Sequence, residues 1–260
     1  MYVSFFWNIV IMDTTQIIIL AAGKGTRMGG DIPKALTQLG DQSMLEHVLD
    51  TVESLNMKHK PICVIGYKAE MIRETLGDRA IYALQEEQKG TGHAVSCAMP
   101  LLDPSIEQIL VLYADQPYVS EETIHNLIHL KQNSEHSLAI ATAMIEDDEL
   151  FKNQFYGFGR IIRDDHGHIK AIIESKDANE QERAVREVNP AYFCCDIPWA
   201  IECLSTLKND NSQGEYYLTD LVKIAFAESH YIDSIQINEK EALGANTREQ
   251  LEVLASYLQK

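Results

Sequence analysis

"LAAGKGTRMGGDIPK" spans Leu20–Lys34, directly after the apolar run Ile17–Ile19, and carries four glycines and three basic side chains. It does not fit the P-loop, because neither Gly23 nor Gly25 is followed by four residues and then Gly-Lys-Ser/Thr. It does not fit the dinucleotide fingerprint either, because Met28 stands where the third glycine is needed. The stretch therefore predicts a glycine-rich loop of another kind at the end of a strand.

The glycines and cations of this loop are suited to binding a phosphate. Gly23 and Gly25 permit unusual dihedral angles and close approach, so successive backbone N–H groups can face a phosphate. Arg27 and Lys34 can neutralise the charge of that phosphate. The alternative is a glycine-rich connection with incidental cations, and the glycine content alone leaves both interpretations open.

The composition favours one acidic α/β domain that binds small molecules. The chain has 260 residues, of which 45% are apolar, enough to fill the core of a single domain. Lys and Arg total 22 against 39 Asp and Glu, and the net charge of −17 argues against a nucleic-acid or anionic-membrane partner. Because charges beyond about 8 Å are largely screened, a phosphate in a pocket would respond mainly to local cations such as Lys24.

The cysteines and the N-terminus indicate a cytoplasmic protein. Five cysteines without a CxxC pair predict neither a disulfide framework nor a zinc site. The N-terminal "MYVSFFWNIVIM" lacks a basic start, and its apolar run of about eleven residues is too short to span a bilayer. We expect residues 1–14 to be an extension, with Met12 as an alternative start, and residues 15–260 to form one domain.

Short β-branched runs alternate with amphipathic stretches in the first half of the chain. This pattern predicts strands at Ile17–Leu20, Ile62–Gly66, Ala80–Leu84 and Gln108–Tyr113, and helices at Met44–Leu55, Ala69–Leu76, Gly92–Leu102 and Glu121–Gln132. Strands separated by helices imply βαβ units and parallel pairing. Ligands bind beyond the carboxyl ends of such strands, where the glycine loop lies.

The second half of the chain has a different order of predicted strands and helices. Strands are expected at Ser137–Ile145, Gly159–Arg163 and His168–Ile173, joined by turns, so antiparallel pairs should extend the sheet. Helices are expected at Trp199–Leu207, Glu215–Glu228 and Arg248–Gln259. We therefore predict an α/β fold with a mixed, mostly parallel sheet and antiparallel insertions.

The loop and a series of later motifs resemble the sugar-nucleotide pyrophosphorylases. The loop is similar to the signature LAAGxGTRM followed by Pro-Lys. The later motifs occur in the family's order: "QEEQKGTGHA" (85–94), "YADQP" (113–117), "GFGRI" (157–161), "IIESKDA" (172–178), "VN" (188–189), "NDNSQGEYYLTD" (209–220) and "GANTR" (244–248). Through "KGTGHA" and "NSQGEYYLTD" the chain resembles in particular the uridyltransferase domain of bifunctional uridyltransferase/acetyltransferase enzymes. The resemblance implies a three-layer, Rossmann-like nucleotidyltransferase domain.

The resemblance also implies where the nucleotide binds. Its triphosphate would lie on Leu20, Ala21, Ala22, Gly23, Gly25 and Thr26, with Arg27 and Lys34 as catalytic cations. Gln85, Gly90 and Thr91 would recognise the base, since a side-chain amide and backbone groups can read the edge of uracil. The alternative for Thr91 is a helix N-cap. His93, just inside that helix, is interpreted as structural.

Metal and sugar positions follow from the same resemblance. Asp115 and Asn246 would hold Mg²⁺, which prefers carboxylate and amide oxygens together with substrate phosphates. Taken alone, both side chains are also compatible with turns. The sugar would contact Tyr113, Gly159, Glu174 and Asn189, which without the resemblance are ordinary loop or strand-end residues.

The chain departs from the family pattern beside the sugar. The family usually has Gly at Ala114 and Thr-Gly at Pro190–Ala191, so a hydrogen-bond donor is lost and the backbone there is stiffer. The chain also ends soon after Asn246, and we therefore expect no hexapeptide-repeat acetyltransferase domain.

The expected activity is Mg²⁺-dependent formation of a UDP-sugar, UDP-N-acetylglucosamine in the first instance, from UTP and a sugar 1-phosphate. Two alternatives stay open. One is an enzyme of the same fold that uses another base or a polyol phosphate. The other is a sugar-nucleotide sensor or regulatory protein that has lost turnover.

Overall fold

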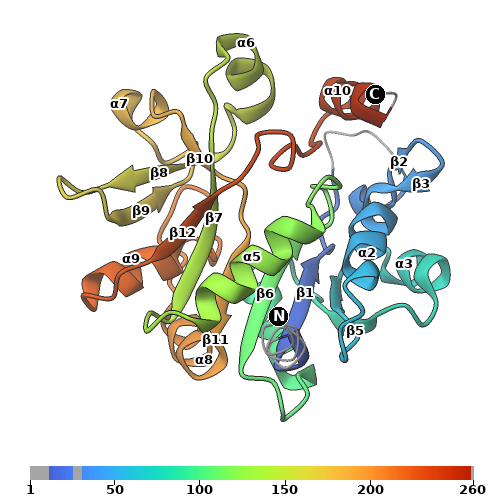
Figure 1. Ribbon diagram of the computed structural model, residues 1–260. Helices are drawn as coiled ribbons and strands as arrows, with labels where there is room; N and C mark the ends of the chain where they lie inside the picture. Colours follow the sequence, from blue (N-terminus) through green and yellow to red (C-terminus); the bar gives the residue numbers. More distant parts are fainter. Residues whose placement is uncertain (1–11, 26–30, 259–260) are drawn as a thin grey trace, which may run out of the picture.

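A mixed sheet forms the centre of the molecule (Figure 1). The computed structural model describes residues 12–25 and 31–258. Its strands are β1 (Thr15–Leu20), β4 (Ile62–Ile65), β5 (Ile81–Leu84), β6 (Gln108–Tyr113), β7 (Leu138–Met144), β8 (Gly159–Arg163), β9 (Ile169–Ile173), β10 (Glu187–Asn189), β11 (Phe193–Asp196) and β12 (Asp233–Gln236). They form a 10-stranded sheet in the order β5-β4-β1-β6-β11-β7-β10-β8-β9, with β12 beside β7. A separate hairpin joins β2 (Gln38–Leu39) to β3 (Gln42–Ser43).

The strand directions agree with the expected mixture. Strands β5, β4, β1 and β6 pair in parallel, and β12 is parallel to β7. Strand β11 is antiparallel to both β6 and β7, β10 is antiparallel to β7 and β8, and β9 is antiparallel to β8. Only β9, β10 and β11 therefore run against the other strands of the described sheet. The prediction of a mostly parallel sheet with antiparallel insertions is confirmed.

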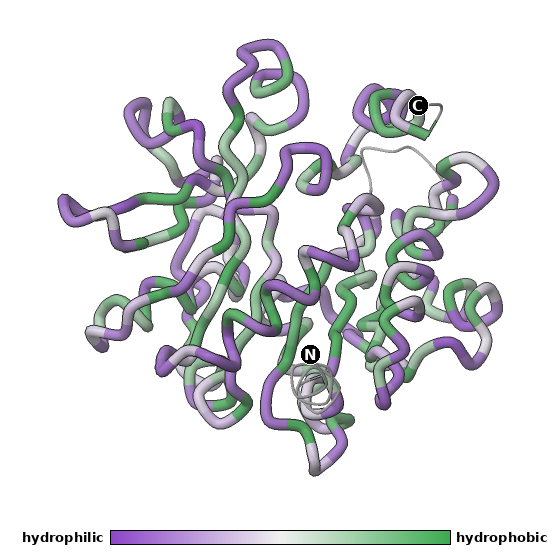
Figure 2. Tube along the Cα trace, viewed as in Figure 1, coloured by the Kyte–Doolittle hydropathy of each residue, from purple (hydrophilic) through white to green (hydrophobic). Residues whose placement is uncertain are grey.

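Helices cover both faces of this sheet, which gives three layers. One face packs against α2 (Met44–Ser54), α3 (Ala69–Leu76), α5 (Glu121–Gln132) and α10 (Arg248–Leu258). The other face packs against α4 (Thr91–Ala98), α8 (Ile197–Thr206) and α9 (Asp220–Ala227). In β1, Ile17 and Ile19 belong to the first core and Ile18 and Leu20 to the second, which explains the unbroken apolar run. Figure 2 shows apolar residues along the strands and polar residues along the connecting loops.

Short helical segments complete the chain. They are η2 (Lys34–Leu36), η3 (Met99–Leu101), α6 (Asp148–Leu150), η4 (Phe151–Phe155) and α7 (Glu180–Arg183). Side chains fix where the main helices begin: Ser43 and Glu46 form a capping box at α2, and Ser120 accepts a hydrogen bond from Thr123 N at α5. Both helices start where the sequence predicted.

Two predicted helices are shorter than expected. Gly92–Leu102 was expected to be one helix, but α4 ends at Ala98 and continues as the 3₁₀ turn η3, because Pro100 has no N–H to donate. Glu215–Glu228 was also expected to be helical, but α9 begins only at Asp220. The backbone of Tyr216 bonds instead to Lys89 O (2.8 Å) and to Gly92 N (2.8 Å), which draws this segment out of the helix.

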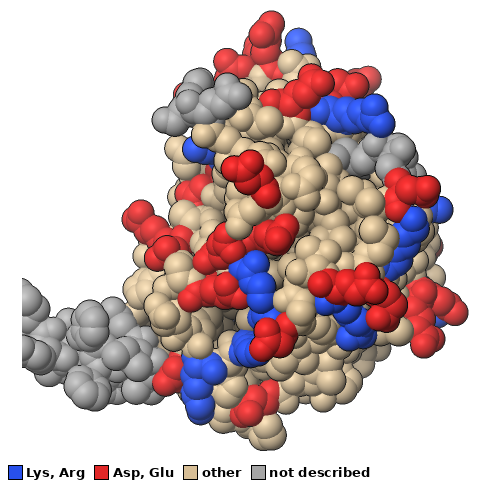
Figure 3. All heavy atoms as spheres, turned by 90° about the vertical axis from the view of Figure 1, so that its right-hand side faces the viewer, with Lys and Arg blue, Asp and Glu red and all other residues tan. Residues whose placement is uncertain are grey.

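None of the helices that the structure describes is long and apolar enough to cross a membrane. Acidic and basic side chains are interspersed on the face shown in Figure 3. Residues 1–11 of the expected N-terminal extension lie outside the described part of the chain, whereas Met12 is buried in the core.

Candidate active site

A cavity lies at the carboxyl ends of β1 and β6. Hydrogen bonds from Ala114 N to Leu20 O (3.1 Å) and from Ala21 N to Val64 O (2.8 Å) hold the chain that leaves β1 against its neighbours. The cavity has a volume of about 240 Å³. The structure brings these predicted site residues to its lining: Leu20, Ala21, Ala22, Gly23, Lys34, Gln85, Gly90, Thr91, Tyr113 and Asp115.

Gly25 supports Lys34 from behind. Its φ angle of +65° lies in the left-handed region, and a Cβ atom there would come within 2.5 Å of the Lys34 Cβ. Glycine is therefore needed both for the turn and for the close approach. Lys24 extends over the ring of Tyr67, with Nζ 5.3 Å from the ring centre. Thr26 and Arg27, which the sequence placed in the phosphate loop, lie outside the described residues.

Lys34 joins the two predicted metal ligands. Its Nζ donates to Asp115 Oδ2 and to Asn246 Oδ1, the latter at 2.7 Å. A backbone hydrogen bond from Ala245 N to Asp115 O (3.2 Å) holds the two loops together. Gly244 makes this possible, since a Cβ atom there would lie 3.1 Å from Asp115 O. The two oxygens therefore converge on one positively charged atom.

Gln85, Gly90 and Thr91 lie close together in the lining of this cavity. The buried Gln85 side chain donates from Nε2 to Gly90 O (3.0 Å) and lies 3.1 Å from His93 Nδ1. Gly90 has a φ of +107° and precedes α4, and no side chain caps that helix. Thr91 is its first residue, and the Thr91 hydroxyl accepts from Leu218 N (3.0 Å). Thr91 is therefore not the N-cap considered as an alternative.

A second cavity of about 210 Å³ adjoins the first. Thr91, Tyr113, Asp115 and Glu215 line both, so Asp115 stands on the shared wall. The second cavity also contains the other predicted sugar and metal positions, Gly159, Glu174, Asn189 and Asn246. Every predicted site residue that the structure describes thus lies in one of the two cavities or, in the case of Gly25, directly behind Lys34.

Three neighbouring strands position the second cavity's polar groups. Gly159 in β8 pairs in register with Asn189 in β10, and Glu174 follows β9. A Cβ atom at position 159 would lie 2.8 Å from the Ile172 side chain and 3.6 Å from Glu174 Oε1. Asn189 Oδ1 accepts from Ala191 N (2.9 Å), and this turn holds Ala191 at a φ of +67°.

The Glu174 carboxyl group is half-buried in the wall of the second cavity. Its Oε1 accepts from the Thr219 hydroxyl (3.0 Å). Burial raises the pKa of Glu174, and the hydrogen bond from Thr219 only partly offsets that effect. Burial likewise raises the pKa of Tyr113, which therefore stays a neutral hydroxyl. The second cavity thus offers oxygen acceptors and amide groups suited to the hydroxyls of a sugar.

Sequence reasoning missed several lining residues. Glu215 lines both cavities, and Tyr217, Thr219 and Gln213 line the second. All lie in the motif "NSQGEYYLTD", which indicates the family, but the pattern from Glu215 onward predicted a helix. Its extended backbone, paired with Lys89 and Gly92, is what brings it to the site.

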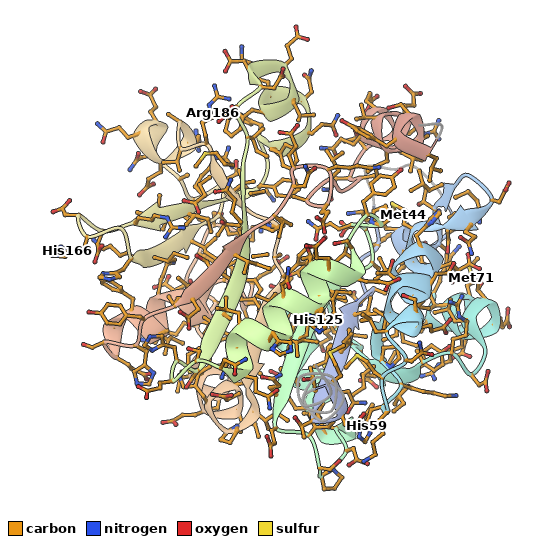
Figure 4. All side chains as sticks on the ribbon, viewed as in Figure 1. Met44, His59, Met71, His125, His166 and Arg186 are labelled. Atoms are coloured by element: carbon orange, nitrogen blue, oxygen red, sulfur yellow. The ribbon has the colours of Figure 1, made fainter. Side chains whose placement is uncertain are left out.

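The charged side chains that line the two cavities are those of Lys34, Asp115, Glu174 and Glu215. No histidine or cysteine in the described ranges 12–25 and 31–258 lines either one. His59, His125 and His166 lie on separate parts of the fold, with His166 at the tip of the β8–β9 hairpin (Figure 4). The site is therefore suited to chemistry that depends on orienting substrates and neutralising charge.

The fold and this site define a nucleotidyltransferase. In such phosphoryl-transfer enzymes catalysis rests on positioning and on cations around the phosphates, and the protein need not form a covalent bond. The glycine loop and Lys34 provide the first cavity with those features, and the second cavity adjoins it at Asp115.

The chain belongs to the MobA-like NTP transferase domain family, whose model matches residues 17–202. It is 41% identical over 244 residues to the bifunctional protein GlmU of Clostridium acetobutylicum, covering 94% of this chain and 52% of that protein. It is 43% identical over 241 residues to the bifunctional protein GlmU of a Psychrobacter species, covering 92% and 50%. The chain spans about half the length of these curated relatives. The resemblance found in the motifs is confirmed.

Two solved structures share the fold. One, from Bacillus anthracis and assigned as a glucose-1-phosphate thymidylyltransferase, has a TM-score of 0.73 at 16% identity and covers 95% of this chain and 96% of its own. The other, 4-diphosphocytidyl-2C-methyl-D-erythritol synthase from Anaerococcus prevotii, has a TM-score of 0.64 at 19% identity and covers 96% and 100%. At these identities the likeness supports the Rossmann-like nucleotidyltransferase fold alone.

Proposed function

We propose that this chain forms UDP-N-acetylglucosamine and pyrophosphate from UTP and N-acetylglucosamine 1-phosphate. An oxygen of the sugar phosphate attacks the α-phosphorus of UTP, and the bond to the β-phosphate breaks. The observation that carries the proposal is the pair of adjoining cavities with Asp115 on their shared wall. A nucleotide in the first cavity and a sugar phosphate in the second would meet beside that carboxylate.

The donor set at the shared wall fits Mg²⁺. A carboxylate and an amide oxygen, from Asp115 and Asn246, converge on one point that the ammonium group of Lys34 contacts. Both are hard oxygen ligands of the kind that Mg²⁺ accepts while it retains water and phosphate ligands. A bound Mg²⁺ would neutralise phosphate charge between the two substrates.

Lys34 and Arg27 would supply the remaining positive charge. The Lys34 side chain is 13% exposed, and it lies in the first cavity next to the glycine loop. There it can donate to the triphosphate and to the leaving pyrophosphate, in which negative charge develops. We assign Arg27 the same task on the basis of its place in the loop motif, together with Thr26 as a backbone donor.

The second cavity favours a sugar with an acetamido group. Because Asn189 Oδ1 accepts from Ala191 N, the Asn189 amide nitrogen is the part left to donate to a ligand. A carbonyl oxygen such as that of an acetamido group is its complement. Glu174 and the neutral hydroxyl of Tyr113 would contact the sugar hydroxyls, and the backbone of Gly159 would lie beside the ring.

The match to the NTP transferase family and the similarity to the relatives named GlmU support nucleotidyl transfer, and each of these relatives is about twice as long as the matched region. We also place the enzyme in the cytoplasm, with residues 15–260 as a single nucleotidyltransferase domain. The chemistry would then require only nucleoside triphosphate, sugar 1-phosphate and Mg²⁺.

A pyrophosphate-release assay tests the proposal. UTP, CTP, GTP and dTTP are crossed with several sugar 1-phosphates and a polyol phosphate, with and without Mg²⁺. We expect the highest kcat/KM for UTP with N-acetylglucosamine 1-phosphate. Replacing Lys34 or Arg27 by Ala should reduce kcat/KM by roughly tenfold to a hundredfold, the loss of one charge-assisted contact. The proposal would be overturned if the protein binds a UDP-sugar tightly but shows no Mg²⁺-dependent turnover with any pair of nucleoside triphosphate and sugar phosphate.

A further inference from the structure

His93 lies behind Gln85, the residue that lines the base end of the first cavity. Gln85 is 3% exposed, and its backbone is fixed by hydrogen bonds to Ile65 O (2.8 Å) and from the Gln88 amide (3.1 Å). What the backbone does not determine is which atom of the side-chain amide, the oxygen or the nitrogen, faces the cavity. That amide has two polar neighbours, Gly90 O at 3.0 Å and His93 Nδ1 at 3.1 Å from the same atom.

These two contacts determine which way the amide points. A backbone carbonyl can only accept a hydrogen bond, so the amide atom beside Gly90 O must be the nitrogen. The same nitrogen then donates to His93 Nδ1, and this hydrogen bond assigns the ring the tautomer with its proton on Nε2. Nε2 faces the Sγ atom of Cys97 at 3.8 Å, a weak acceptor. With both amide hydrogens engaged, the oxygen of Gln85 is the atom presented to a base.

We propose that His93 is a positioning residue that selects uracil over cytosine by holding the amide oxygen of Gln85 toward the base. The inference rests on the proposed uridylyl transfer and deepens it. Uracil carries a hydrogen on N3, which an amide oxygen accepts, whereas N3 of cytosine is itself an acceptor and meets that oxygen unfavourably. A binding site discriminates more strongly between two substrates when the wrong one leaves a buried polar group of the protein without a partner than when it only loses an apolar contact.

Three substitutions at one position separate positioning from structure. In His93→Asn the side-chain oxygen takes roughly the place of Nδ1, so the acceptor for Gln85 is kept. In His93→Gln the polar atoms extend toward the place of Nε2, and in His93→Leu there is no acceptor. Cys97→Ala removes the other neighbour of the imidazole and serves as the control. All four proteins are compared with the wild type by circular dichroism and thermal melting.

The readouts are kcat and KM for UTP and CTP, and calorimetric binding of each nucleotide in the presence of Mg²⁺. His93→Leu and His93→Gln should lower the preference for UTP over CTP by about three- to tenfold, the equivalent of one neutral hydrogen bond, mainly through KM. His93→Asn and Cys97→Ala should retain the preference. A purely structural role would reduce activity with both nucleotides equally and leave the ratio unchanged.

Failure of the His93 proposal and failure of the proposed function give different results. Folded His93→Leu or His93→Gln protein with a wild-type UTP/CTP ratio would refute the role of His93 while leaving uridylyl transfer intact. Wild-type protein that turns over no UTP with any sugar phosphate would refute the proposed function, and the calorimetric ratio would still test His93. If His93→Leu does not fold, the UTP/CTP preference of His93→Gln is compared with that of His93→Asn. This pair tests the same role with two polar side chains.

Discussion

Lys34 and Asn246 lie 212 residues apart in the chain, yet Lys34 Nζ donates to Asn246 Oδ1 at 2.7 Å. The same ammonium group pairs with Asp115, which is 81 residues from Lys34. The three side chains come from η2, the end of β6 and the loop before α10, so only the folded sheet edge brings them together. Because the Lys34 ammonium group donates to both oxygens, it offsets the negative charge of the Asp115 carboxylate. It also holds the two predicted metal ligands close together.

Asn246→Ala should weaken metal binding and leave the Lys34–Asp115 pair in place. We expect the Mg²⁺ concentration for half-maximal activity to rise about tenfold, since one ligand oxygen is lost, whereas Asp115→Ala should lower kcat/KM by a hundredfold or more. Magnesium titrations of pyrophosphate release measure both. Asp41→Asn, at an exposed turn, is the control. An unchanged magnesium requirement in Asn246→Ala would remove Asn246 from the ligand set.

Gly25→Ala should displace Lys34. The added methyl group would meet the Lys34 side chain at 2.5 Å, in addition to the cost of a positive φ of +65°. Gly167, in the turn between β8 and β9, is the control, because it also has a positive φ of +86° but nothing within 4 Å of the added atom. Both variants should lose about 1–2 kcal/mol of stability from the backbone conformation. Only Gly25→Ala should also lose activity, by roughly tenfold or more. Equal activities in the two variants would contradict this.

Local signals were sufficient for the parallel half of the fold. The apolar runs and caps around β1, α2, β4, α3, β6 and α5 predicted elements whose ends agree with the structure to within a few residues. In each case periodicity, a capping side chain or a turn acts within the segment itself. The predictions failed where distant backbone decided the outcome, as for residues 215–219, whose hydrogen bonds go to the segment 89–92. The short strands β10 and β11 were missed for the same reason, because their pairing partners, not their sequence, define them.

The candidate site also has one part that local sequence patterns predict and another part that depends on distant contacts. Motifs identified the residues at the edge of the sheet, because a glycine loop and an Asp after an apolar strand have recognisable local patterns. No pattern indicated that Lys34 lies between Asp115 and Asn246, or that Thr219 contacts Glu174. Those contacts depend on how the loops fold over the sheet.

Ala191→Gly should stabilise the protein. Ala191 has a φ of +67° in the turn that Asn189 closes, a conformation that costs a residue with a Cβ about 1 kcal/mol or more and that glycine adopts freely. The melting temperature should therefore rise by about 2–4 °C for a chain of this size. Ser229→Gly is the matched control, with a φ of +61° after α9 and away from both cavities. Its melting temperature should also rise, while the KM for the sugar phosphate should change only in Ala191→Gly.

Glu174→Gln should stabilise the protein in a pH-dependent manner. Burial raises the pKa of Glu174 above its ordinary value of 4.5, so the folded protein holds this proton more tightly than the unfolded chain. The contribution of Glu174 to stability is then fully present below this ordinary pKa of 4.5, which applies to the unfolded chain, and is lost as the pH rises through the folded pKa. Glutamine does not titrate and keeps the acceptor for Thr219.

The melting temperature of Glu174→Gln should therefore exceed that of the wild type at pH 7, and the difference should shrink as the pH is lowered to 4. The KM for the sugar phosphate should rise about tenfold, because a neutral oxygen accepts from sugar hydroxyls less strongly than a carboxylate. Melting curves at several pH values and initial rates measure the two effects, with the exposed Glu180→Gln as the control. A difference in melting temperature that is constant across this range would show that the Glu174 carboxyl has the same pKa in the folded and unfolded chain.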